Sequence, residues 1–214
     1  MDAVQQMLGS EYCMFYHAGI PCDQLTPALT LTQCIDSVNQ ALHTQGKNLN
    51  TWQEFQRNRA AKLVRAHVIY QNLEVEPIRK PILIYKKHQQ YTVIVGDTRL
   101  MALSQRSTVE PIAVLLTCKK DQAGEYWNWK SVANIDDLCQ CTNMDLSDKR
   151  IKFTPAEPQS DYPVDWLEFG DTTTAHHLHD YQQRLDMMQR YLDQQYDDYR
   201  FEPNWLDRKI TWNP

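Results

Sequence analysis

Apolar residues fall into two kinds of pattern along this chain. Short β-branched and aromatic runs, bounded by turn residues, predict strands at 12–17, 82–85, 91–95, 111–117 and, at an edge, 151–153. Longer stretches with apolar side chains every three or four positions predict amphipathic helices at 32–45, 50–73 and 174–199, with a short helix at 2–8. The chain therefore mixes both kinds of element.

The stretch 91–106 combines three local signals. A buried strand at 91–95 stops at Gly96, where the chain can turn without steric penalty, and a helix is expected from Arg99 to about residue 106. A helix that starts directly after a strand has backbone N–H groups without intrahelical partners, and these favour anions such as phosphate. Asp97, Thr98 and Arg99 lie on this turn. Asp97 is either a helix N-cap, a base or a Mg²⁺ ligand.

The order of elements from 51 to 117 is helix, strand, strand, helix, strand. This order predicts an α+β fold, a small mixed sheet with packed helices, extended by the long C-terminal amphipathic helix. We expect three parts. An N-terminal strand and helix (1–50) packs on a core domain (51–153), and an acidic helical extension (154–214) follows.

Composition narrows the class of protein. The chain has 214 residues and 42% apolar content, enough for a core, and no apolar run of about 18 residues, so no membrane span is expected. The N-terminus carries Asp2 and Glu11 instead of a basic segment, which argues against a secretory signal. Six cysteines without framework spacing are typical of reduced thiols, so we expect a cytoplasmic protein.

Charge is distributed unevenly. Residues 51–120 hold twelve Lys and Arg against five Asp and Glu, whereas 155–214 hold five against twelve. The basic block is a candidate surface for DNA or RNA, and the alternative is a solvated face. The apolar stripe of the 174–199 helix predicts burial against its own domain, a second copy or a protein partner.

The pattern from 51 to 117 resembles the ParB/sulfiredoxin-like superfamily. The matching residues are Pro81 and Ile82 at the first strand, the 91–95 strand, the sequence GDTR at 96–99 and the strand that starts at Pro111. Ala102 matches the small residue that follows the signature. The resemblance covers about a third of the chain. Stand-alone proteins of this size with such a domain resemble those carried by phages and mobile elements.

This resemblance implies a nucleotide site for CTP or ATP, with Mg²⁺. The family includes CTP-binding DNA-partition proteins, ATP-using sulfiredoxins and small-molecule kinases, in which the glycine turn and its arginine hold phosphates. If the roles of the family's residues apply to this chain, Gly96 allows the backbone to approach the nucleotide closely, and Arg99 contacts a phosphate. Asp97 occupies the position at which partition proteins have a glutamate and sulfiredoxins have the catalytic cysteine. Thr98 occupies the position of a basic residue in the family. Without a thiol in the turn, sulfinic-acid reduction is excluded.

Two readings of function follow. In the first, the protein binds a nucleotide and uses Asp97 as catalytic residue for phosphoryl transfer or hydrolysis, with Gly96, Thr98, Arg99, Arg79 and Lys80 around the phosphates. In the second, the protein keeps the fold but catalyses no reaction, and it binds a nucleic acid or another protein.

Other groups of residues give weaker evidence for a functional site. His176 and Asp180 have the i,i+4 spacing of a metal pair but no further ligands nearby, and Cys139 and Cys141 lack the two-residue spacer of a zinc site, so no metal is expected. The aromatic side chains of Tyr126, Trp127 and Trp129, beside Lys119, Lys120 and Lys130, suit either base stacking or core packing.

Overall fold

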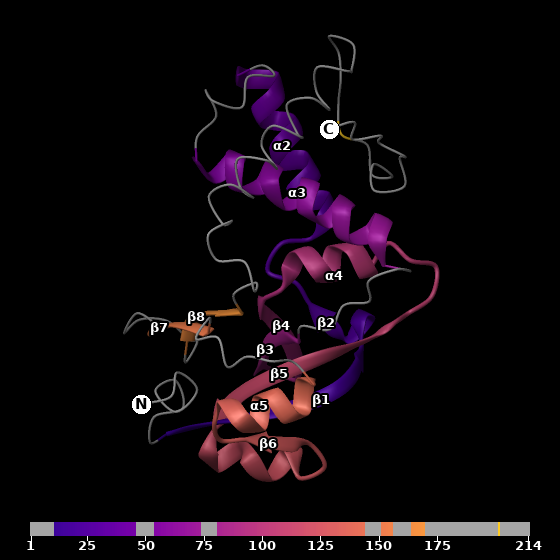
Figure 1. Ribbon diagram of the computed structural model, residues 1–214. Helices are drawn as coiled ribbons and strands as arrows, with labels where there is room; N and C mark the ends of the chain where they lie inside the picture. The colour runs from indigo at the N-terminus through magenta and orange to yellow at the C-terminus, as the bar shows by residue number, and fades with distance from the viewer. Residues whose placement is uncertain are drawn as a thin grey trace. The chain divides into compact units, whose positions relative to one another are not determined.

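The computed structural model describes residues 11–45, 54–73, 81–143, 151–155, 164–169 and residue 201. Its elements are β1 (Tyr12–Pro21), η1 (Cys22–Gln24), β2 (Leu25–Thr26), α2 (Leu31–Gln45), α3 (Glu54–Asn72), β3 (Ile82–Lys87), β4 (Gln90–Val95), α4 (Asp97–Leu103), β5 (Pro111–Lys119), η3 (Lys120–Tyr126), β6 (Lys130–Val132), α5 (Ile135–Thr142), β7 (Ile151–Pro155) and β8 (Val164–Phe169). The expected α+β class agrees with these elements (Figure 1).

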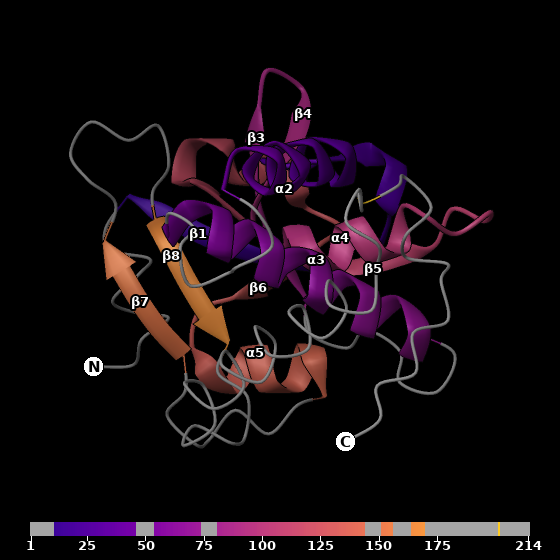
Figure 2. The same ribbon diagram turned by 90° about the horizontal axis from the view of Figure 1, so that it is seen from above.

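Six strands form one mixed sheet in the order β2-β4-β3-β5-β1-β6. β1 pairs antiparallel with β5 and with β6, and β3 pairs antiparallel with β4. The β3–β5 and β2–β4 pairs are parallel. A parallel pair needs a crossover connection, and between β3 and β5 this connection contains β4 and α4. A separate antiparallel pair, β7 and β8, is drawn in orange in Figure 2.

The strands predicted at 82–85 and 91–95 are confirmed as β3 and β4, which form an antiparallel hairpin. His88 and Gln89 connect the two strands, with φ angles of +48° and +71°. Positive φ at both central residues is the type I′ turn, whose twist matches that of paired strands. The turn forms here without glycine, so the strand pairing stabilises two side chains in the left-handed region.

Two compact units divide the chain. The first contains 1–28, 78–100 and 106–174, and the second contains 29–77, 101–105 and 175–214. The six-stranded sheet belongs to the first unit, and α2 with α3 belongs to the second. The three-part division expected from the sequence stays a prediction.

A hydrophobic cluster holds α5 against one face of the sheet in the first unit. Directly paired residues of a sheet point to the same face, so Tyr16, Leu115 and Leu83 share one side. Leu138 of α5, with no exposed surface, packs against this row together with Met14 and Val132. α5 begins at its cap, where the Asn134 side chain accepts a hydrogen bond from the Asp137 N–H.

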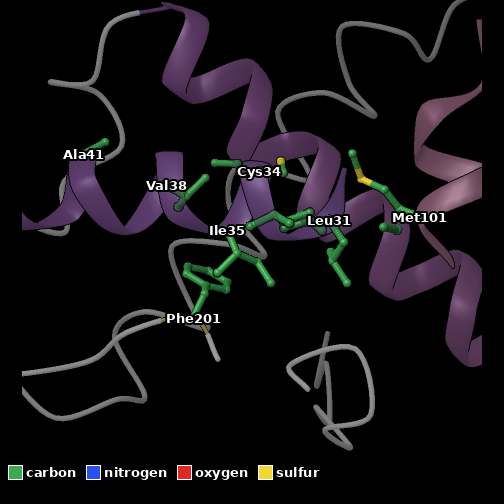
Figure 3. Close-up of a cluster of buried hydrophobic side chains, with 11 residues drawn as sticks. Leu31, Cys34, Ile35, Val38, Ala41, Met101 and Phe201 are labelled. Carbon is green, nitrogen blue, oxygen red and sulfur yellow. The ribbon is translucent and has the colours of Figure 1, made fainter. Parts of the chain in front are cut away.

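The second unit is built on the facing apolar sides of α2 and α3. Its buried cluster is shown in Figure 3 and consists of Leu31, Cys34, Ile35, Val38, Ala41, Ala60, Leu63, Val64, Ala66, Met101 and Phe201. The periodicity of Ile35, Val38 and Leu42 is confirmed, since the first two are buried and the third packs against them. Phe201 joins from far along the chain, and Asn39 bonds both its N–H and its carbonyl, at 2.7 and 2.9 Å.

Several element boundaries differ from those expected. α2 begins one residue before Thr32, because Thr30 and Gln33 exchange reciprocal side-chain bonds with each other's N–H groups, as in a capping box. β1 continues through Gly19 to Pro21, where it still pairs with Pro111 of β5. Two elements were not expected from the sequence: the 3-10 helix η3, which follows β5, and the helix α5, which follows β6.

Some expectations lie outside the described residues. These are the helices at 2–8 and 174–199, His176 and Asp180, and the basic pair Arg79 and Lys80. Within the described part of the chain, no helix is both long and apolar enough to cross a membrane.

Candidate functional site

The candidate site is the turn between β4 and α4. Gly96 has a φ of +121°, outside the range that L side chains adopt readily. Its carbonyl accepts hydrogen bonds from the N–H groups of Arg99 at 2.9 Å and Leu100 at 3.1 Å. Because the N-cap carbonyl is the one that accepts the first intrahelical bond, Gly96 is the N-cap of α4. Asp97 is therefore the first helical residue, so of the three alternatives given for it the N-cap was wrong.

Packing also requires glycine at this position. A Cβ atom on Gly96 would lie 2.9 Å from Cγ1 of Ile82, 3.1 Å from Nη2 of Arg99 and 3.3 Å from Cγ2 of Ile82. Ile82 has no exposed surface and starts β3. The backbone of the turn thus lies directly against the first residue of the central hairpin. Pro81 and Ile82, the residues that carried the family resemblance, are the ones that this turn contacts.

The Arg99 side chain folds back over the turn. Its Nη1 donates to the Pro81 carbonyl at 3.0 Å, and its Nη2 lies beside Gly96. The residue is half-buried. A guanidinium has five N–H donors, so the Pro81 carbonyl takes one of them. The cationic group is held close to the positive end of the α4 dipole, an arrangement that an anion would stabilise.

The Asp97 carboxylate is buried, with 9% of the residue exposed. Its Oδ1 accepts a hydrogen bond from the Ala28 N–H at 3.1 Å. Ala28 follows β2, the strand that pairs with β4 just before this turn. Asp97 therefore links α4 to the segment after β2. Sequence reasoning missed this partner, because the two residues are 69 positions apart.

Thr98 is half-buried and is the second residue of α4. Of the six residues predicted from the sequence, the structure brings together Gly96, Asp97, Thr98 and Arg99. Arg79 and Lys80 lie outside the residues that the structure describes, so their place at this site stays a prediction.

The aromatic residues near η3 divide into two groups. Tyr126 is buried against Phe15, with ring centres 5.5 Å apart, and burial raises the pKa of its hydroxyl, followed by the influence of Tyr91. Trp129 contacts the rings of His17 at 4.9 Å and Tyr91 at 6.0 Å. These contacts confirm packing for Tyr126 and Trp129. Trp127 differs, because 85% of its surface is exposed.

Lysines lie around these rings. Lys86 forms an ion pair with Glu125 at 2.7 Å, and its Nζ lies 5.6 Å above the Tyr126 ring. Lys119, Lys120 and Lys130 are exposed.

Metal binding has no support from the described side chains. Among them, no three or more His, Cys, Asp or Glu are grouped as ligands for a metal ion. Cys139 and Cys141 are half-buried on α5, and burial is the main cause that raises the pKa of the Cys141 thiol.

Comparisons with models of known protein families, with curated proteins and with solved structures found no match to this chain.

Proposed function

We propose that this chain is a ParB-like nucleotide-binding protein that holds the phosphates of CTP or ATP, with Mg²⁺, at the turn 96–99. One observation carries the proposal: a glycine packed on Ile82 lets the Arg99 guanidinium lie against the backbone at the start of a helix. Backbone N–H groups, a helix dipole and a fixed guanidinium are the components of phosphate sites.

The polar groups of the turn support this assignment. Thr98, as second residue of α4, carries one of the N–H groups that a helix leaves without an intrahelical carbonyl. Its hydroxyl adds a further donor on the same turn. Arg99 is positioned in advance by Pro81, so little side-chain freedom is lost when phosphate binds.

We place binding ahead of turnover. A general base has to reach the nucleophile of the reaction, directly or through one water. The Asp97 carboxylate is buried and already accepts a backbone hydrogen bond from Ala28. In the proposed function, Asp97 is therefore a positioning residue that fixes the start of α4. Phosphoryl transfer or hydrolysis is a second activity, measured separately by release of phosphate.

The test measures binding of CTP, ATP and GTP by calorimetry, with and without Mg²⁺. Thr98→Glu places a negative charge at the proposed phosphate position, while glutamate in a first helical turn is favourable for the helix itself. We expect this variant to stay folded and to lose at least about tenfold in affinity, because like charges oppose each other. Arg99→Ala should weaken binding by roughly 10- to 100-fold, the worth of a hydrogen bond to a charged group.

Arg106→Ala is the matched control. Arg106 follows α4 and pairs with Glu110 at 3.0 Å, so its removal should leave nucleotide affinity unchanged. The proposal fails if none of the three nucleotides binds. It also fails if the Thr98 variant binds as tightly as the native chain.

The exposed Trp127 favours a second candidate function, binding of single-stranded nucleic acid. A large aromatic ring with 85% of its surface in water is a stacking platform available to any base. Lys119, Lys120 and Lys130 are exposed and lie eight, seven and three positions from it along the chain, although the exposed Asp121 reduces the positive charge there.

Anisotropy of labelled oligo-dT and oligo-U at two salt concentrations tests this second candidate. Trp127→Ala should weaken binding by roughly 5- to 100-fold, because base stacking contributes ~1–3 kcal/mol. Val109→Ala removes the other large apolar side chain that is exposed among the described residues, with 56% exposure, and serves as control. Equal affinity of the two variants would eliminate Trp127 as a stacking residue.

A further inference from the structure

Two cysteines face each other across neighbouring strands of the sheet. Cys13 of β1 is paired directly with Cys118 of β5, and their Sγ atoms are 3.5 Å apart. Both are free thiols, and they are 105 positions apart in the chain. The proposed nucleotide turn uses neither of them.

The Cα separation of this pair permits a covalent bridge, at the cost of some strain. Residues directly opposite in an antiparallel pair have Cα atoms about 4.5 to 5.5 Å apart, inside the range of disulfides. The Lys120 N–H donates to the Glu11 carbonyl at 2.9 Å. That hydrogen-bonded pair lies two positions from Cys13 and Cys118, so by the two-residue alternation of the ladder they also form a hydrogen-bonded pair. The sulfur atoms need to approach by only about 1.5 Å to reach bonding distance.

Exposure gives the two thiols different roles. Cys13 is half-exposed, whereas 2% of Cys118 is exposed. Burial, assisted by the hydrogen bond with Cys13, raises the pKa of the Cys118 thiol to about 12. Cys118 is thus kept protonated and shielded, and an oxidant in solution meets Cys13 first.

We propose that Cys13 and Cys118 are a thiol pair that a hydroperoxide converts into a reversible β1–β5 disulfide. The Cys13 thiolate attacks the peroxide oxygen, the O–O bond breaks, and an alcohol or water leaves with a proton from solvent. The resulting Cys13 sulfenic acid is attacked by the Cys118 sulfur, which gives up its proton. The S–S bond forms and the sulfenic oxygen leaves as water. Overall, two thiols are oxidised and one peroxide is reduced. An external dithiol restores both thiols by exchange.

The bridge joins the start of β1 to the end of β5, next to η3, which is followed by the exposed Trp127. It also closes a long loop of the chain, which restricts the unfolded state. We therefore expect oxidation to raise the melting temperature by roughly 5–15 °C, less any strain of a bridge at a hydrogen-bonded pair.

The experiment treats the full chain with hydrogen peroxide and compares it with the untreated chain. We expect loss of two hydrogens in mass, a fall from six free thiols to four, and a cross-linked peptide that tandem fragmentation assigns to Cys13 and Cys118. The melting temperature should rise, and dithiothreitol should reverse all of these changes.

Two variants keep the result interpretable. Cys13→Ser removes the reacting thiol at a half-exposed position, so peroxide should no longer raise the melting temperature. Cys139→Ser removes a half-buried thiol on α5 and should behave like the native chain. The proposal is overturned if Cys13 bridges to another cysteine or is over-oxidised without a bridge. It is equally overturned if the Cys13 variant still gains stability on oxidation.

Discussion

Replacing Gly96 with alanine tests the geometry of the turn on which the proposed nucleotide site depends. The substitution changes one hydrogen into a methyl group and leaves charge untouched. The φ of +121° is strained for any L side chain, and the new Cβ would stand 2.9 Å from a core isoleucine, Ile82. Arg99 would also have to shift, because its Nη2 is 3.1 Å from the same point.

The expected loss in free energy of unfolding has two parts. A backbone conformation that only glycine adopts readily costs ~1–3 kcal/mol. Forcing a methyl group against a fully buried side chain adds ~1–3 kcal/mol. Since Arg99 is half-buried and can move aside, we take the lower part of this range, about 2–4 kcal/mol in total. For a chain of this size, that loss lowers the melting temperature by roughly 5–15 °C.

Urea unfolding, followed by circular dichroism, measures this loss directly. The midpoint should fall while the m-value stays constant, because the change affects the folded state. Gly124→Ala is the control. Among the described residues no heavy atom lies within 4 Å of its Cβ position, so its cost should stay below ~0.5 kcal/mol. If the two variants unfold at the same urea concentration, the close contact between Gly96 and Ile82 is refuted.

Three further predictions concern packing, a polar bridge and pH. Leu138→Ala should cost ~2–5 kcal/mol in calorimetry, because a fully buried leucine is lost between α5 and the sheet, and a loss below ~1 kcal/mol would contradict that packing. Asn39→Ala should speed amide exchange at Phe201, since it removes the acceptor at 2.7 Å; unchanged exchange would exclude this bond. The Cys118 thiol has a pKa near 9 when unfolded and about 12 when folded, so its contribution to stability is complete below pH 9 and is lost as pH rises from 9 to 12. In Cys118→Ala the urea midpoint should fall less between pH 9 and pH 12 than in the native chain. An equal fall of the midpoint in the two proteins would refute this.

Much of the sheet could be predicted because its strands are apolar runs with local boundaries. Residues 82–85, 91–95 and 111–117 all lie within strands of the structure. The strand order could not be predicted, since pairing β3 with β5 in parallel and β1 with β6 depends on contacts between distant residues. α5 was missed because it is only eight residues long, although Ile135, Leu138 and Cys139 follow helical spacing and pack on one cluster.

The candidate turn was located from the sequence, but its side-chain partners were not. Glycine between a strand and a helix is a local signal, and the structure places Gly96 there with a positive φ. One partner of Arg99 is a carbonyl 18 positions away, and one partner of Asp97 is an N–H 69 positions away. Backbone groups of this kind carry no mark in the sequence, because every residue has them.

These two partners decide what chemistry the turn can support. Both charged side chains of the turn satisfy backbone groups: Arg99 donates to the Pro81 carbonyl, and Asp97 accepts from the Ala28 N–H. Pro81 and the Asp97 side chain are buried, and an unsatisfied buried polar group costs ~1–3 kcal/mol, so each contact resists being given up during a reaction. A guanidinium has five N–H donors, so binding of a phosphate by Arg99 does not itself require loss of the Pro81 contact. Asp97 would have to leave Ala28, or work through its second oxygen, to accept a proton. The same pair of contacts therefore favours phosphate binding over catalysis. Asp97→Asn separates the two: if it abolishes phosphate release while nucleotide affinity persists, the carboxylate is catalytic after all, and our order of functions is reversed.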